Sequence, residues 1–161
     1  MIERTVGIDL AVRGEHVARI LDDGRPVGRP IRFRLTSAAL DRFVAAITAG
    51  LPPGAPVTAV MEPTGMAWFP IATRLGRAGV RVIRVKGQRV RALRKYLSEH
   101  VKSDLTDAHV LGALPGFGGA RLDPVFVPSP EQHALRRLTK QRERFEAAAC
   151  AGKRRLLDLI R

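Results

Sequence analysis

The feature that most constrains the fold is a change in the spacing of apolar residues after the first third of the chain. Apolar side chains recur at every second position in three early segments, residues 4–11, 16–21 and 27–35. Asp23-Gly24 is a turn signal between the second and third segments, so the pattern predicts three antiparallel strands. From Thr36 the apolar residues follow helical spacing instead, which predicts a helix that ends at Gly50.

The rest of the chain alternates further strands with helices. We expect strands at 57–62 and 80–85 and helices at 66–77, 87–97, 103–114 and 130–161. Pro115 should break the helix at 103–114, and Ser129 with Gln132 should form a capping box at the start of the last helix. Helical crossovers make the later strands parallel to the first. The order predicts an α/β, ribonuclease H-like fold with a mixed five-stranded sheet, flanking helices and a long C-terminal helix.

The charge of the chain indicates the kind of partner. Lys and Arg number 28 against 15 Asp and Glu, which gives a net charge of +13. A domain this basic usually binds a polyanion, and nucleic acid is the first candidate; a membrane surface or solubility alone are the alternatives. No segment approaches the roughly 18 apolar residues of a membrane span, and the start is not a signal peptide. A single cysteine, Cys150, excludes a disulfide framework, and we expect a cytoplasmic protein.

Two acids stand at positions where a core strand disfavours charge. Asp9 interrupts the apolar run of the first strand, and Glu62 closes the run 57–61. A carboxylate beside a core costs several kcal/mol unless it is paired, hydrogen-bonded or holding a metal. If the two strands are parallel neighbours, both acids lie near one end of the sheet, where open α/β sheets place their sites.

A second pair of acids, Asp104 and Asp107, shares one face of a predicted helix. Acids in a first helical turn are also favoured by the helix dipole alone, so a purely structural role is the alternative. With Asp9 and Glu62 they make four carboxylates in a basic protein. Mg²⁺ prefers such oxygen ligands and is often completed by substrate phosphates, which fits phosphodiester chemistry.

Three stretches in chain order resemble the D-E-D-D signature of the insertion-sequence 110 family of transposases: GIDLA at 7–11, MEPTG at 61–65 and KSDLTDA at 102–108. Residues 124–131 and the Arg-rich segment after them are similar to the linker and coiled coil of that family. The resemblance implies that Asp9, Glu62, Asp104 and Asp107 are catalytic and bind Mg²⁺, with Mn²⁺ as a substitute. It also implies that the ribonuclease H-like fold is RuvC-like, and that DNA and a structured guide RNA are partners.

The resemblance further implies a second domain with a serine nucleophile, which does not follow within this chain, so we expect an incomplete recombinase. We expect a catalytic domain at 1–122, a linker at 123–130 and a long helix at 131–161 that joins copies of the chain into a homo-oligomer. Two alternatives stay open, a non-catalytic nucleic-acid-binding module of the same fold and a Holliday-junction resolvase-like nuclease.

One segment before the second acid pair carries positive charges almost exclusively, and this favours a track for a phosphate backbone over a merely solvated face. The residues that we expect to contact nucleic acid are Arg84, Lys86, Arg89, Arg91, Arg94, Lys95 and Lys102.

Overall fold

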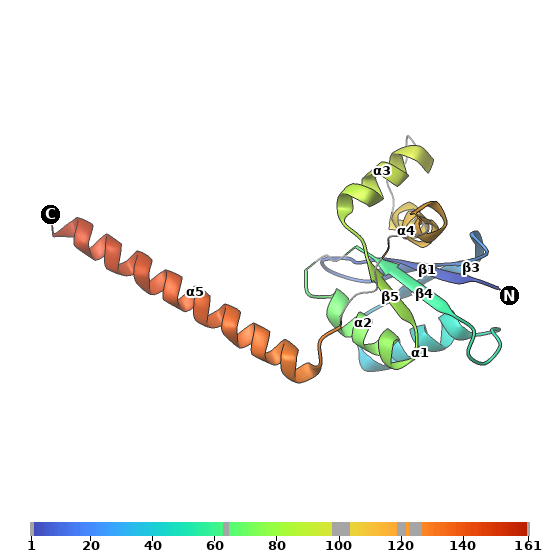
Figure 1. Cartoon of the computed structure of the whole chain (residues 1–161), viewed down its shortest axis with the longest axis horizontal. Coiled ribbons are helices and arrows are strands. Elements are labelled where there is room, and N and C mark those ends of the chain that lie inside the picture. The colour runs from blue at the N-terminus through green and yellow to red at the C-terminus, as the bar shows by residue number, and fades with distance from the viewer. Residues whose placement is uncertain (1, 63–64, 98–103, 119–121, 123–126, 161) are drawn as a thin grey trace. The chain divides into compact units, whose positions relative to one another are not determined.

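The computed structural model describes residues 2–62, 65–97, 104–118, 122 and 127–160, and only the backbone of Arg89, Leu97, Asp104, Gly118 and Pro130. Its strands are β1 (Arg4–Asp9), β2 (His16–Asp22), β3 (Arg25–Phe33), β4 (Val57–Met61) and β5 (Arg81–Arg84). Its helices are α1 (Ser37–Thr48), α2 (Trp68–Arg77), α3 (Gly87–Leu97), α4 (Asp104–Gly118) and α5 (Pro130–Leu159). Figure 1 shows the elements in chain order.

The five strands form one mixed sheet in the order β3-β2-β1-β4-β5. β1, β2 and β3 are antiparallel neighbours, as the turn at Asp23-Gly24 predicted. β4 runs parallel to β1, and β5 runs parallel to β4, because α1 and α2 carry the chain back between strands. The predicted α/β fold with a mixed five-stranded sheet is confirmed.

Helices cover both faces of the sheet (Figure 1). On the α1/α2 face, a large apolar cluster includes Ile8, Phe43 and Ile71, each no more than 2% exposed. On the α3/α4 face, a smaller cluster joins strand residues such as Val60 to Leu111 of α4. Alternate residues of each strand therefore point to different helical layers.

Two helix starts have the caps that the sequence predicted. The Thr36 hydroxyl accepts a hydrogen bond from the Ala39 N–H at 3.3 Å and caps α1. At α5 the Ser129 hydroxyl accepts from the Gln132 N–H, and the Gln132 side chain accepts from the Ser129 N–H. Both caps satisfy backbone donors that have no partner inside their helix.

The predicted break at Pro115 is wrong, since α4 continues through this residue to Gly118. Proline removes one helical hydrogen bond, the one to the carbonyl four residues earlier, and here the loss falls near the end of the helix. Buried Leu111 and Leu114 hold the preceding turn against the sheet. β3 also begins and ends two residues earlier than predicted.

The described chain divides into two compact units, Met1–Val127 and Pro128–Arg161. The predicted cap at Ser103 and most of the predicted linker 123–130 lie outside the described residues. None of the described helices combines the length and the hydropathy that a membrane crossing requires.

Candidate functional site

Asp9 and Glu62 lie side by side at the carboxyl end of the sheet. The parallel register of β1 and β4 pairs Ile8 with Met61, and each acid is the next residue of its strand. Ile8 and Met61 point into the α1/α2 cluster, so the two acids point to the α3/α4 face. Neighbouring strands are about 4.8 Å apart, which places two partly buried carboxylates close together.

The side chain of Glu62 packs against the start of α3. A Cβ atom added at Gly87 would lie 2.5 Å from Glu62 Oε1, so a larger residue would require this carboxylate to shift. Gly87 is the first residue of α3, where the helix dipole favours negative charge. The glycine thus leaves space for the Glu62 carboxylate in its present position, and the start of α3 favours its negative charge.

Two glycines bring α4 into backbone contact with β1. A Cβ at Gly7 would overlap the Ala108 carbonyl oxygen and the Gly112 nitrogen, and a Cβ at Gly112 would overlap the Leu21 side chain. A glycine inside a strand often marks such a close approach, which is the signal that our sequence analysis missed. The contact fixes the height of α4 above the sheet.

The direction of α4 brings its first turn to the carboxyl end of β1. The last turns of α4 border a cavity with Glu3 and Thr5 at the other end of that strand, so the helix runs antiparallel to β1. The four residues from Ala108 back to Asp104 span about 6 Å of helix. This length is close to the rise of the strand from Gly7 to Asp9. The backbone of Asp104 therefore lies one turn beyond Ala108, near the level of Asp9; its side chain is outside the described part.

Asp107 forms an ion pair with Arg94 of α3. Arg94 Nη2 lies 2.6 Å from Asp107 Oδ1, and the two side chains are 23% and 14% exposed. The contact is close, but within the described chain neither Asp107 Oδ1 nor Arg94 Nε has a hydrogen-bond partner. This carboxylate oxygen is thus paired with a guanidinium group but makes no hydrogen bond of good geometry.

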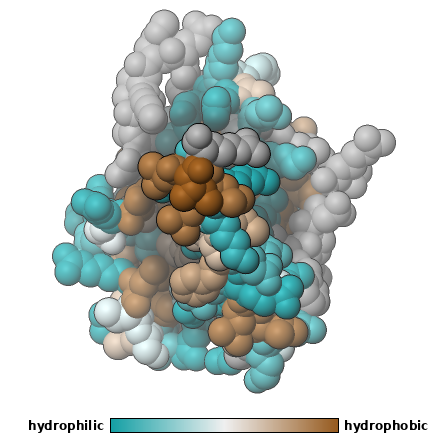
Figure 2. All heavy atoms as spheres, turned by 90° about the vertical axis from the view of Figure 1, so that its left-hand side faces the viewer, coloured by the Kyte–Doolittle hydropathy of each residue, from teal (hydrophilic) through white to brown (hydrophobic). Residues whose placement is uncertain are grey.

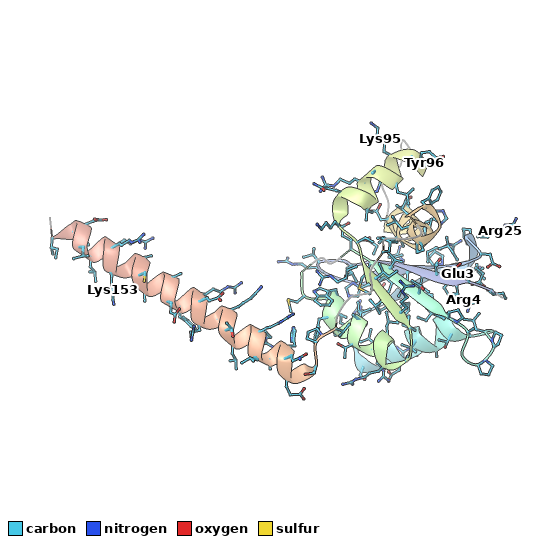
Figure 3. All side chains as sticks on the ribbon, in the orientation of Figure 1. Glu3, Arg4, Arg25, Lys95, Tyr96 and Lys153 are labelled. Atoms are coloured by element: carbon cyan, nitrogen blue, oxygen red, sulfur yellow. The ribbon has the colours of Figure 1, made fainter. Side chains whose placement is uncertain are left out.

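The predicted nucleic-acid residues have different surroundings. Lys86, Arg91 and Lys95 are exposed, and Figure 3 shows Lys95 on the outer part of α3. Arg84 is also exposed, but its guanidinium lies 4.2 Å from the Trp68 ring centre, and its pairing with Met61 puts it on the α1/α2 face. The Arg89 side chain and Lys102 lie outside the described residues.

Arg19 of β2 adds positive charge to this face, and its effect is seen at His109 of α4. Burial lowers the pKa of His109, and the nearby charge of Arg19 lowers it further. Arg19 pairs with Gly7 in the β1–β2 ladder and therefore shares the face of Asp9. Sequence reasoning missed Arg19 because it lies outside the continuous basic run.

The carboxylates fit a hard divalent cation by their donor chemistry. Asp9, Glu62 and Asp107 supply only oxygen atoms, and one of those at Asp107 is buried without a hydrogen bond. The described side chains alone, Asp104 being outside them, contain no cluster of three His, Cys, Asp or Glu placed to hold a metal ion. In the geometry shown, Arg94 is the cation that Asp107 contacts.

Comparisons with known proteins identify the family and agree with the fold. A family model of DEDD transposases of the insertion-sequence 110 type, described as "Transposase", matches residues 6–161. The solved structure of T. thermophilus RuvC in complex with a Holliday junction substrate is 13% identical and has a TM-score of 0.54. The match covers 76% of this chain and 99% of that chain, and it shows the same fold. Among curated proteins, none matches significantly.

Proposed function

The chain belongs to the DEDD transposase family of insertion sequence 110, and on this premise we propose that it carries the metal-dependent domain that processes DNA phosphodiesters. The observation that supports this most strongly is the register of β1 and β4, which sets Asp9 beside Glu62 beneath the first turn of α4. Two acidic strand ends and one acidic helix turn then converge on one edge of a basic domain.

We propose Asp9, Glu62, Asp104 and Asp107 as the residues that hold Mg²⁺, or Mn²⁺ in its place. When bound, the metal supplies charge neutralisation at the phosphodiester and activation of the attacking oxygen. For Asp107 to coordinate the metal, Arg94 must release the Asp107 carboxylate. Gly87 keeps Glu62 oriented toward the site, and the backbone contact at Gly7 keeps α4 at the height that the acids require.

The exposed cations of α3 fit the phosphate backbone of the substrate. Arg91 and Lys95 lie on α3, the helix that also bears Arg94, and Lys86 directly precedes this helix. Phosphate contacts of this kind position a nucleic acid without reading its bases. By resemblance to the family, a structured guide RNA, a cytoplasmic location and a separate serine-bearing domain for complete recombination also belong to the proposal.

The test is a calorimetric titration of the full chain with Mg²⁺, with and without duplex DNA. We expect saturable binding that Asp9→Asn abolishes, while the metal-free stability stays unchanged or rises because repulsion between Asp9 and Glu62 is relieved. Asp23→Asn is the matched control. Asp23 lies in the turn after β2, and its Oδ1 accepts from the Glu3 N–H, a role that asparagine retains.

The outcome also separates the two other functions. Absence of saturable Mg²⁺ binding even with DNA present would leave a non-catalytic binding module. Cleavage of four-way junctions by this chain alone, lost in Asp9→Asn, would favour a resolvase-like nuclease instead of a domain that needs a second one.

For α5 we propose self-association with the α5 of a second copy. Its large apolar side chains are exposed and recur with coiled-coil spacing at Leu135, Leu138, Phe145 and Leu156, between 63% and 73% exposed. Figure 2 shows brown, apolar residues in the foreground, where the end of α5 faces the viewer. A helix of 30 residues with an uncovered apolar stripe is not stabilised by its own contacts.

Light scattering on the full chain tests this association. Leu138→Lys with Phe145→Lys should lower the molar mass, as should truncation after Pro128, whereas Arg136→Lys should not. A dimer that survives both changes would place the interface on the first unit.

A further inference from the structure

A row of side chains crosses the sheet at the level of the acids. Asp9 pairs with Val17 of β2, and Val17 pairs with Arg32 of the edge strand β3. Residues opposite each other in a ladder point to the same face. Arg32 therefore belongs to the α3/α4 face, two strands from Asp9 and on the side away from α3.

Arg32 and its neighbour Arg34 are free to bind an anion. Arg32 is exposed, and within the described chain it makes no ion pair. Arg34 directly follows β3, and among the described residues its acid contact is a long one of 3.5 Å to Glu15. Both partners of that pair are well exposed, at 72% and 43%, so water screens the interaction.

A simpler explanation of these arginines is protection of the sheet edge. β3 is an edge strand, and charged residues and prolines on such strands prevent pairing with other chains. β3 carries Pro26, Pro30 and exposed arginines along its whole length, including Arg25 at its far end. If edge protection were their only role, Arg25 and Arg32 would have the same effect when replaced. If Arg32 also binds an anion near the acids, only its replacement weakens that binding.

We propose that Arg32, assisted by Arg34, binds backbone phosphates of the DNA strand on the side of the acids opposite to α3. This inference rests on the proposed function. A strand whose reacting phosphate lies at Asp9 and Glu62 continues in two directions, and α3 supplies cations for only one of them. Two strand spacings place Arg32 about 10 Å from Asp9, which corresponds to about three nucleotides at 3.4 Å each.

The test measures the affinity of the full chain for a fluorescent DNA duplex by anisotropy across a salt series. Arg32→Gln should make the slope of log affinity against log salt shallower by about 0.9, the value for one lost phosphate contact. Adding Arg34→Gln should reduce the slope further. A structured RNA and vesicles of anionic lipid are measured in parallel.

The matched control is Arg25→Gln on the same strand. Arg25 pairs with Asp22, at the end of the sheet where β1 begins. Figure 3 shows Arg25 toward the same end as Glu3 and Arg4. It is seven residues from Arg32, roughly 20 Å along the strand, so its removal should leave the slope on DNA unchanged.

The outcomes separate this inference from the proposed function. Equal effects of Arg25→Gln and Arg32→Gln, or none, overturn the inference, as does an effect of Arg32→Gln confined to RNA or to vesicles. Arg91→Gln and Lys95→Gln report on the proposed function independently. If they change the DNA slope and Arg32→Gln does not, the function stands and the inference fails. If all three leave the slope unchanged, DNA binding through this edge fails altogether.

Discussion

The two faces of the sheet are each covered by a pair of helices, yet they are built differently. The α1/α2 face holds a continuous apolar cluster in which Phe33 and Phe43 stack with ring centres 4.1 Å apart. The α3/α4 face holds a smaller cluster, a backbone-to-backbone contact at Gly7 and a partly buried ion pair. The comparison teaches that one face provides most of the apolar burial, while the other tolerates like charges side by side.

The largest expected effect is on the α3/α4 face, from Gly7→Ala. A Cβ at this position would overlap the backbone of α4, which no side-chain rotation can relieve. We expect the free energy of unfolding to fall by more than about 5 kcal/mol, measured by urea denaturation. Gly76→Ala in α2 is the control, because its Cβ meets open space, and it should stabilise by about 0.5–1 kcal/mol. A small change in the free energy of unfolding of Gly7→Ala would contradict a rigid contact between β1 and α4.

Phe43→Ala tests whether the α1/α2 face contributes to the stability of the fold without affecting Mg²⁺ binding. Phe43 is 2% exposed, and its removal leaves a cavity between α1 and the sheet. We expect a loss of about 3–5 kcal/mol in unfolding free energy, with Mg²⁺ affinity unchanged at temperatures where the variant stays folded. A parallel loss of Mg²⁺ affinity would mean that the two faces are not independent.

Arg94→Gln tests the ion pair that distinguishes the α3/α4 face. Without the guanidinium, the mostly buried Asp107 carboxylate loses its cation, and the metal-free protein should lose about 1–2 kcal/mol after allowance for partial exposure. Mg²⁺ then meets no competitor at Asp107 and should bind more tightly and restore the thermal midpoint. Arg91→Gln, on the same helix but exposed, should change the midpoint little. Weaker Mg²⁺ binding in Arg94→Gln would show that Arg94 positions Asp107 for the metal.

The smallest expected effect is acid sensitivity of the α1/α2 face through His16. Burial lowers the pKa of His16, whose Nδ1 accepts a hydrogen bond from the Ala11 N–H at 3.1 Å. As the pH falls below about 6.5, the unfolded chain binds a proton that the folded protein resists. Stability therefore decreases until the folded pKa is reached and is constant below it.

Urea midpoints measured from about pH 8 to about pH 5 report this loss, which should not exceed about 1.4 kcal/mol per unit of pKa difference. His16→Phe should remove that part of the pH dependence. An unchanged pH profile in His16→Phe would assign the acid sensitivity to other groups.

Periodicity predicted the strand and helix order because the apolar residues of each element must meet one core. It also predicted the meeting of Asp9 and Glu62, since both acids end strands that a right-handed crossover makes parallel. The continuation of α4 through Pro115 could not be predicted, because burial of Leu111 and Leu114 outweighs the lost hydrogen bond.

Two features of the site depend on tertiary contacts that a linear pattern does not contain. Arg94 belongs to a run of positive charges that predicted contacts with a phosphate backbone, and only the packing of α3 on α4 turns it toward Asp107. The position of Arg32 depends on the β2–β3 register, which shifts between Ala18 and Ile20. A shift of one residue would have put Arg32 on the opposite face.

The glycine contact between β1 and α4 also sets the order in which the acids meet during synthesis. β1 leaves the ribosome before the other strands of its sheet, and α4 is made only after the whole sheet. Asp9 and Glu62 become neighbours once β4 pairs with β1, but Asp107 joins them only when α4 docks on Gly7. Contacts between segments so distant in the chain form late. A nascent chain therefore completes the β2–β3 hairpin, with the arginines of β3, well before its set of acids is complete.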